Sequence, residues 1–90
     1  MRLNRRIIQK LLNNFGGEEY VKPLRDGEST RLYEIIHDTD KIGDYLSSAS
    51  LFIYKVKRQG GGLHYTLLKL FKIKNIKRNA WGKVVSYEID

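Results

Sequence analysis

The stretch LFIYKVKRQGGGLHYTLLKLFKIKNIKR, residues 51–78, decides the fold because glycines join two strand-like runs within it. Residues 51–58 are rich in β-branched and aromatic residues and alternate at their end, and residues 63–76 continue in the same style. Two such runs separated by the glycine-rich residues 59–62 predict an antiparallel hairpin. The glycines lack the spaced Gly-Lys-Ser/Thr frame of a phosphate-binding loop and open no helix, which favours the turn.

Within the second run, residues 67–76 alternate with the period of a strand. As a helix, the apolar residues would scatter round the whole axis, so a helix is the less favoured alternative. As a strand, Phe71 and Ile73 share one face, which predicts that they belong to the core. Lys72 and Lys74 then lie on the opposite face.

That alternation slips near 69–70 and again near 75–76. Such slips are typical of a β-bulge or of a bend, and a bent central strand curls a small sheet toward a barrel. Residues 77–82 break the pattern with turn-forming Asn and Gly, and residues 83–89 predict a further strand. Residues 51–89 therefore predict a three-stranded antiparallel meander.

The first 17 residues predict an amphipathic helix of about three turns. Its apolar stripe consists of Ile7, Ile8, Leu11, Leu12 and Phe15. Asn4 is suited to cap the start of the helix. Gly16 and Gly17 are expected to end it, one of them in the left-handed conformation. A helix this short is marginal alone and needs a sheet to pack against.

The acidic middle segment, residues 18–50, begins with a short extended piece. Residues 18–25 predict an edge strand or a loop, because Pro23 cannot donate a hydrogen bond to a neighbouring strand. Residues 25–29 contain the Asp-Gly of a turn.

Residues 30–37 alternate apolar and polar side chains and predict a strand, with a helix capped by Ser29 as the alternative. Residues 38–50 begin with capping residues and predict a short helix, although Gly43 and the serines weaken that prediction. The inward-facing residues of this helix would be Ile42, Tyr45 and Leu46.

The 90 residues are the length of one small domain. The fold class we predict is α+β: an N-terminal amphipathic helix, 1–17, packed on a small, curled, mostly antiparallel sheet of four or five strands with a barrel-like bend. The sequence has no cysteine, which excludes disulfides, thiolate metal sites and thiol catalysis. An apolar fraction of 41% is too high for a disordered chain.

The net charge of +7 is unevenly distributed along the chain. Residues 1–17 hold four basic groups and no acid, and residues 18–50 hold eight acids and four bases. Residues 51–87 hold nine bases and no acid. The basic side chains of this last region must be solvated, paired with the acidic middle segment or used on an external anion.

A basic sheet face with nearby aromatic rings is the combination that holds single-stranded nucleic acid. The candidate nucleic-acid-binding residues are Lys55, Lys57, Arg58, Lys69, Lys72, Lys74, Lys77, Arg78, Lys83, Tyr54, Tyr65 and Trp81. Whether the two lysine groups share one face depends on the strand register. A solvated lysine face that keeps a β-protein soluble is the competing interpretation. Trp81 is either an exposed contact residue or a turn residue folded back on the sheet.

A catalytic interpretation rests on two histidines. His37 lies beside Asp38 and Asp40, a cluster that could bind a metal or form a general-base pair. A strand end followed by a helix cap explains the same residues better, and His64 stands alone after the glycines. We therefore expect no enzymatic activity, no metal and no cofactor.

The function we expect is that of a small non-catalytic basic binding protein that contacts nucleic acid through a lysine-rich sheet face. The alternative is a protein–protein interaction module that docks on an acidic protein or forms a homo-oligomer. The Lys-, Ile- and Asn-rich composition is typical of a phage or another mobile element. No apolar run is long enough to span a bilayer, and residues 1–15 lack the uninterrupted apolar stretch of a secretory signal. We therefore expect a cytoplasmic location.

Overall fold

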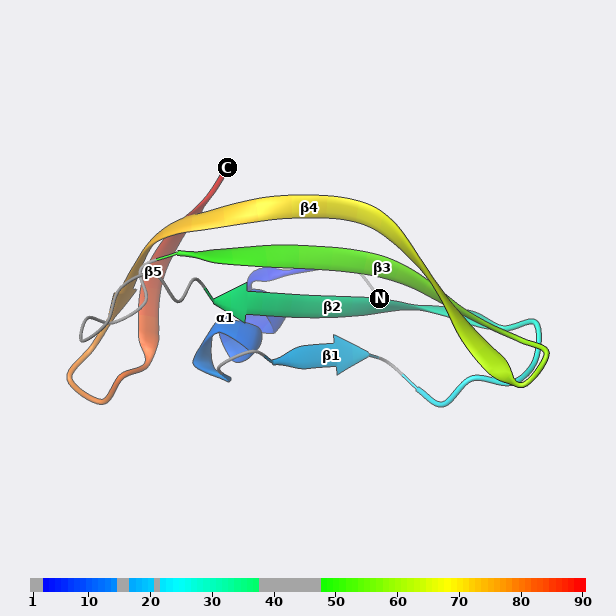
Figure 1. Ribbon diagram of the computed structural model, residues 1–90. Coiled ribbons are helices and arrows are strands. Elements are labelled where there is room, and N and C mark those ends of the chain that lie inside the picture. Colours follow the sequence, from blue (N-terminus) through cyan, green and yellow to red (C-terminus); the bar gives the residue numbers. More distant parts are fainter. Residues whose placement is uncertain (1–2, 15–16, 21, 38–47) are drawn as a thin grey trace.

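One helix and five strands make up this computed structural model, which describes residues 3–14, 17–20, 22–37 and 48–90. The elements are α1 (Arg5–Asn13), β1 (Glu18–Tyr20), β2 (Ser29–His37), β3 (Ala49–Gln59), β4 (Gly62–Arg78) and β5 (Val84–Ile89). The strands form a single antiparallel sheet in the order β1-β2-β3-β4-β5 (Figure 1). The predicted α+β class and the C-terminal meander are confirmed.

The hairpin between β3 and β4 turns at Gly60 and Gly61, which have positive φ angles of 60° and 80°. Two consecutive residues in the left-handed region match the turn that best fits the twist of a two-residue hairpin, and glycine adopts it without a steric penalty. The pairing runs from Gln59 opposite Gly62 along the full length of β3. The predicted hairpin is therefore confirmed.

Strand β4 is irregular at both positions where its alternation slips. Tyr54 pairs with Leu67 and Ile53 pairs with Lys69, so Leu68 has no direct partner in β3. The second irregularity lies at Asn75, which has a φ of 50°. The extra residue at Leu68 turns Phe71 and Ile73 toward the core, and the irregularity at Asn75 does the same for Ile76. Together the two irregularities bend the strand.

The acidic middle segment contains an edge strand, which is one of the two alternatives predicted for residues 18–25, and the predicted turn and strand after it. β1 pairs with β2 at the edge of the sheet, and Gly27 turns with a φ of 82°. The strand prediction for 30–37 is confirmed, because β2 pairs with both β1 and β3. The helix predicted for 38–50 is wrong at Ala49 and Ser50, because these two residues begin β3. Residues 38–47 lie outside the described part of the chain.

Helix α1 is shorter than the predicted 1–17, since it ends at Asn13. The cap is confirmed: the Oδ1 atom of Asn4 accepts a hydrogen bond from the backbone N–H of Ile7 at 3.0 Å. The left-handed glycine is not found at Gly17, and Gly16 lies outside the described residues. A Cβ on Gly17 would lie 2.8 Å from Asn14, so glycine is needed there for close approach.

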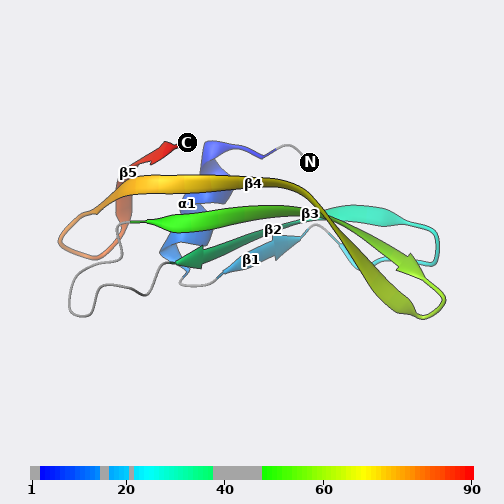
Figure 2. The ribbon, with the colours of Figure 1, turned by 45° about the horizontal axis from the view of Figure 1, so that its top comes forward.

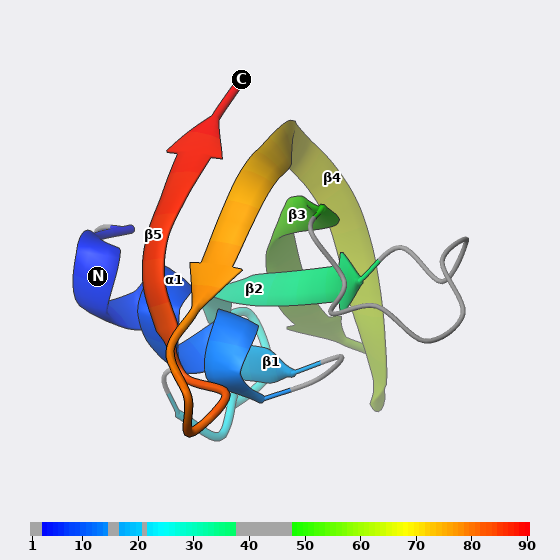
Figure 3. The same cartoon turned by 90° about the vertical axis from the view of Figure 1, so that its left-hand side faces the viewer.

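Helix α1 packs against the inner side of the curled sheet, beside β1, β2 and β5 (Figure 3). We call this side the helix face; its sheet residues include Tyr33, Ile35, Leu51, Ile53, Phe71 and Ile73. Leu11 and Leu12 of α1 are fully enclosed against it. Phe71 packs at the margin of this core and Ile73 lies inside it, as predicted.

The opposite side of the sheet carries no helix among the described residues. We call it the open face; its residues include Leu32, Glu34, Phe52, Tyr54, Tyr65 and Leu70. Phe52 and Tyr54 stack on this face with ring centroids 6.0 Å apart. Tyr65 meets Tyr54 edge to face at 6.3 Å.

Candidate functional site

The two lysine groups lie on opposite faces of the sheet. Lys55 and Lys57 alternate with Ile53 along β3 and therefore belong to the helix face. Lys72 lies opposite Ser50 on the open face, and Lys74 follows it two residues later. The candidate residues consequently do not form one continuous positive face.

Four cations gather on the helix face beyond the end of α1. We call this group the basic surface; it consists of Arg31, Lys55, Lys57 and Lys69, all of which are exposed. Arg31 on β2 lies directly opposite Lys55 on β3. Like charges directly across an antiparallel pair repel each other, so the sheet is stabilised when an anion lies between them.

In the strand pairs that the structure describes, no acidic residue lies directly opposite a cation of this surface. The cross-strand neighbours are Thr66 beside Lys55, and Ser29 and His64 beside Lys57. The hairpin end of β3 and β4 extends past α1, which leaves this part of the helix face uncovered (Figure 2). Among the described residues, none of the four cations forms an ion pair.

Lys69 joins the basic surface from β4, opposite Ile53. Its ammonium lies 5.9 Å from the centroid of the Phe71 ring, which places the charge of Lys69 between the core and the other three cations. A cation–π contact at this distance restrains the lysine weakly and leaves its charge available to solvent or to a ligand.

The lysines of the open face already have contacts within the chain. The ammonium of Lys72 donates a hydrogen bond to the hydroxyl of Ser50 at 3.1 Å. Lys74 forms an ion pair with Asp90 at 2.7 Å, and this hydrogen-bonded carboxylate raises the pKa of Lys74 above its usual value. These two lysines are therefore weaker candidates for an external anion than the basic surface is.

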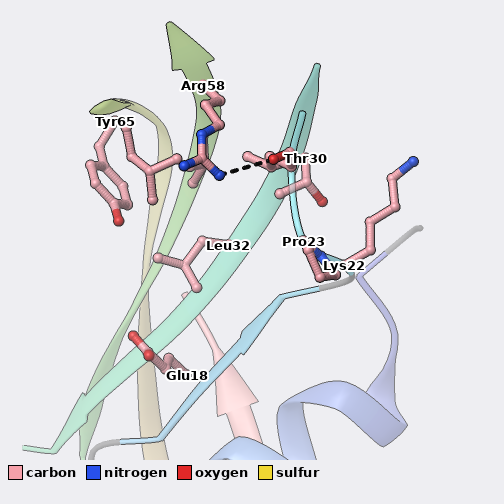
Figure 4. Close-up of a pocket in the computed structure, with 10 residues that line it drawn as sticks. Glu18, Lys22, Pro23, Thr30, Leu32, Arg58 and Tyr65 are labelled. Atoms are coloured by element: carbon pink, nitrogen blue, oxygen red, sulfur yellow. Dashed lines mark hydrogen bonds between the residues drawn. The ribbon is translucent and has the colours of Figure 1, made fainter. Parts of the chain in front are cut away.

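Two candidate arginines hold loops together. Arg58 lies on the open face, and its guanidinium donates to the carbonyl oxygen of Leu24 at 3.1 Å (Figure 4). The guanidinium of Arg78 is half-buried and donates to the carbonyl oxygens of Gly82 and Leu12. Both arginines join segments distant in sequence, which assigns them a structural role.

The aromatic candidates do not accompany the basic surface. Tyr54 and Tyr65 lie on the open face. Trp81 lies in the turn between β4 and β5 with 85% of its surface exposed, so the prediction of a tryptophan folded back on the sheet is wrong. The exposed candidates Lys77 and Lys83 flank the same turn, at the end of the sheet away from the β3–β4 hairpin.

The histidine cluster is only partly described. His37 is buried at the end of β2, with its Nε2 atom 3.5 Å from the guanidinium of Arg78. Asp38 and Asp40 lie outside the described residues, and His64 is exposed on β4. Within the described ranges, no three His, Asp or Glu side chains come together as metal ligands.

Sequence reasoning missed Arg31, because it lies in a segment that is acidic overall. Its alternation with Tyr33 along β2 already assigns it to the core side of that strand. The signal that could have found it is the like-charge pairing with Lys55, which requires the register between β2 and β3.

No protein-family model, curated protein or solved structure matches this chain. In the part of the chain that the structure describes, no helix combines the length and the apolar character needed to cross a membrane.

Proposed function

We propose that this chain is a non-catalytic binding protein that holds the phosphate backbone of a nucleic acid on the basic surface. The observation that carries the proposal is the cross-strand pair of Arg31 and Lys55, flanked by Lys57 and with no acidic residue directly opposite in the described strand pairs. A phosphate chain relieves the repulsion between these cations and releases the counterions condensed on the nucleic acid.

The geometry favours backbone contacts over base stacking. The exposed tyrosine of the hairpin, Tyr65, belongs to the open face, whereas the cations belong to the helix face. Binding should therefore depend on charge and be nearly independent of sequence, because phosphate contacts carry no base information. Single-stranded and double-stranded oligonucleotides should both bind.

Fluorescence anisotropy with labelled oligonucleotides at about 0.1 M salt tests this proposal, since phosphate contacts dominate affinity there. The variant Lys55→Gln/Lys57→Gln should weaken binding on the order of 10- to 100-fold, because two phosphate contacts are removed. The matched control Lys77→Gln/Lys83→Gln removes the same charge at the other end of the sheet and should change affinity by less than about threefold. Equal losses in the two variants would show that net charge alone drives the binding.

An acidic protein is the alternative partner for the same cations. Polyglutamate of matched charge, used as a competitor in the same titration, separates the two possibilities. Displacement of the oligonucleotide at an equal charge concentration would favour the acidic protein. Displacement only at a large excess of polyglutamate supports nucleic acid.

A further inference from the structure

The open face exposes apolar side chains at positions where an antiparallel sheet that faces water is usually polar. Five of them are about half exposed: Ile36 50%, Leu63 47%, Tyr65 55%, Leu67 51% and Leu70 51%. Four of the five come from β4 alone, on both sides of the bulge at Leu68. They adjoin the stacked rings of Phe52 and Tyr54, so the exposed area is continuous.

The size of this apolar area fits a protein interface. Half of one such side chain exposes on the order of 100 Å², so the five together expose roughly 500 Å². That figure lies near the upper end of the largest apolar patch on a typical monomer.

We propose that two copies of this chain pack their open faces together as a two-fold symmetric dimer. Charge supports a second copy as the occupant. The open face is acidic toward β1, at Glu18 and Glu34, and basic on β4, at Lys72. A surface with acids on one side and a base on the other complements itself when one copy is turned by 180°.

The two-fold axis that brings the acids of one copy to the base of the other runs parallel to β3, between the two sheets. It keeps the strands of both copies aligned, as packed sheets commonly are, and sets β2 of one copy against β4 of the other. Glu34 and Lys72 occupy adjacent rows of the open face, so each Glu34 lies near Lys72 of the second copy. The apolar centre, at Phe52 and Leu70, lies close to the axis.

A groove at the hairpin end of the open face fits the same arrangement. Leu32 and Val56 form its buried floor, Leu24 and Leu63 line its sides, and its volume is about 280 Å³ (Figure 4). The groove lies over the row that contains Val56 and Tyr65. The axis therefore brings the exposed ring of Tyr65 from the second copy over this groove.

Sedimentation equilibrium across a concentration series tests the dimer. The unmodified chain should reach twice the 10.5 kDa of one copy. The variant Leu67→Glu/Leu70→Glu should remain at the mass of one copy, because four carboxylates would be buried at the interface. The control Trp81→Glu/Ile89→Glu alters two exposed apolar residues away from the open face and should still dimerise.

A charge exchange keeps the test decisive if the leucine variant does not fold. Glu34→Lys and Lys72→Glu should each weaken dimerisation about tenfold or more, and the two substitutions combined should restore it. A single-copy mass for the unmodified chain at all concentrations overturns the proposal. So does a failure of the combined variant to recover, or an assembly larger than two copies.

Discussion

At the scale of single residues, Leu68 separates the two lysine groups. If Leu68 were paired opposite Ile53, the register of the hairpin would continue, and Lys72 would lie opposite Ala49 on the helix face. One extra residue in β4 reverses every later side chain, so Lys72 lies opposite Ser50 on the open face instead. The bulge therefore confines the basic surface to one end of the molecule.

At the second irregularity of β4, Asn75 adopts a backbone conformation that costs free energy. Its φ of 50° lies in the left-handed region, and its Nδ2 atom donates to Oε2 of Glu88 at 2.6 Å. We expect Asn75→Ala to lower the free energy of unfolding by about 1–2 kcal/mol more than Asn75→Gly does. Both variants lose the hydrogen bond to Glu88. The difference between their free energies of unfolding, measured by urea denaturation, therefore reports the backbone effect alone. Equal destabilisation would show that the φ angle has no energetic weight.

Tyr87 makes stability depend on pH above neutrality. Burial raises the pKa of its hydroxyl, which has no hydrogen-bond partner among the described residues. The folded pKa lies above the unfolded value of about 10, so its contribution is complete below pH 10 and is lost as pH rises through the folded value. Denaturation at pH 8 and pH 11 should show a smaller alkaline loss for Tyr87→Phe than for the unmodified chain. An unchanged pH dependence in this variant would contradict the assignment.

At the scale of elements, α1 depends on the sheet. The helix has nine residues and is too short to be stable alone in water. Leu12 is fully buried, and it is one of the residues through which α1 contacts the core. The helix also supports β5, because Asn13 Oδ1 accepts a hydrogen bond from the N–H of Val84 and the Gln9 amide donates one to the carbonyl oxygen of Val84.

We therefore expect Leu12→Ala to lower the free energy of unfolding by about 2–5 kcal/mol. The helical and sheet signals of circular dichroism should be lost together in a thermal scan, since neither element is stable without the other. Arg6→Ala, at an exposed position of the same helix, should change stability by at most about 0.5 kcal/mol. A sheet that outlasts the helix in the Leu12 variant would refute this coupling.

Most of the elements could be predicted from sequence, because each has a local signal, although the start of β3 at Ala49 was predicted as helix. The paired glycines at 60–61 predicted the hairpin, and the two slips of β4 predicted its bulges. The assignment of the lysines to faces could not be predicted, because it depends on register between strands. Arg31 shows the same limit, since only its pairing with Lys55 identifies it as part of the site.

At the scale of the whole molecule, charge and apolar area occupy opposite faces of one sheet. The chain is elongated, 45 Å in its longest dimension, and the basic surface lies where the hairpin projects beyond α1. Packing of two open faces would leave the two basic surfaces pointing away from each other. The two proposals are therefore compatible and can fail independently, since no residue belongs to both surfaces.

The measurement that tests the proposed function most directly is the salt dependence of oligonucleotide binding. Four cations that neutralise phosphates predict a slope of about −3 for log K against log salt concentration. In Lys55→Gln/Lys57→Gln the magnitude of the slope should fall to about half, because two of the four phosphate contacts are lost, while Lys77→Gln/Lys83→Gln should keep it. A slope near zero, or the same slope in all three proteins, would contradict phosphate binding on the basic surface.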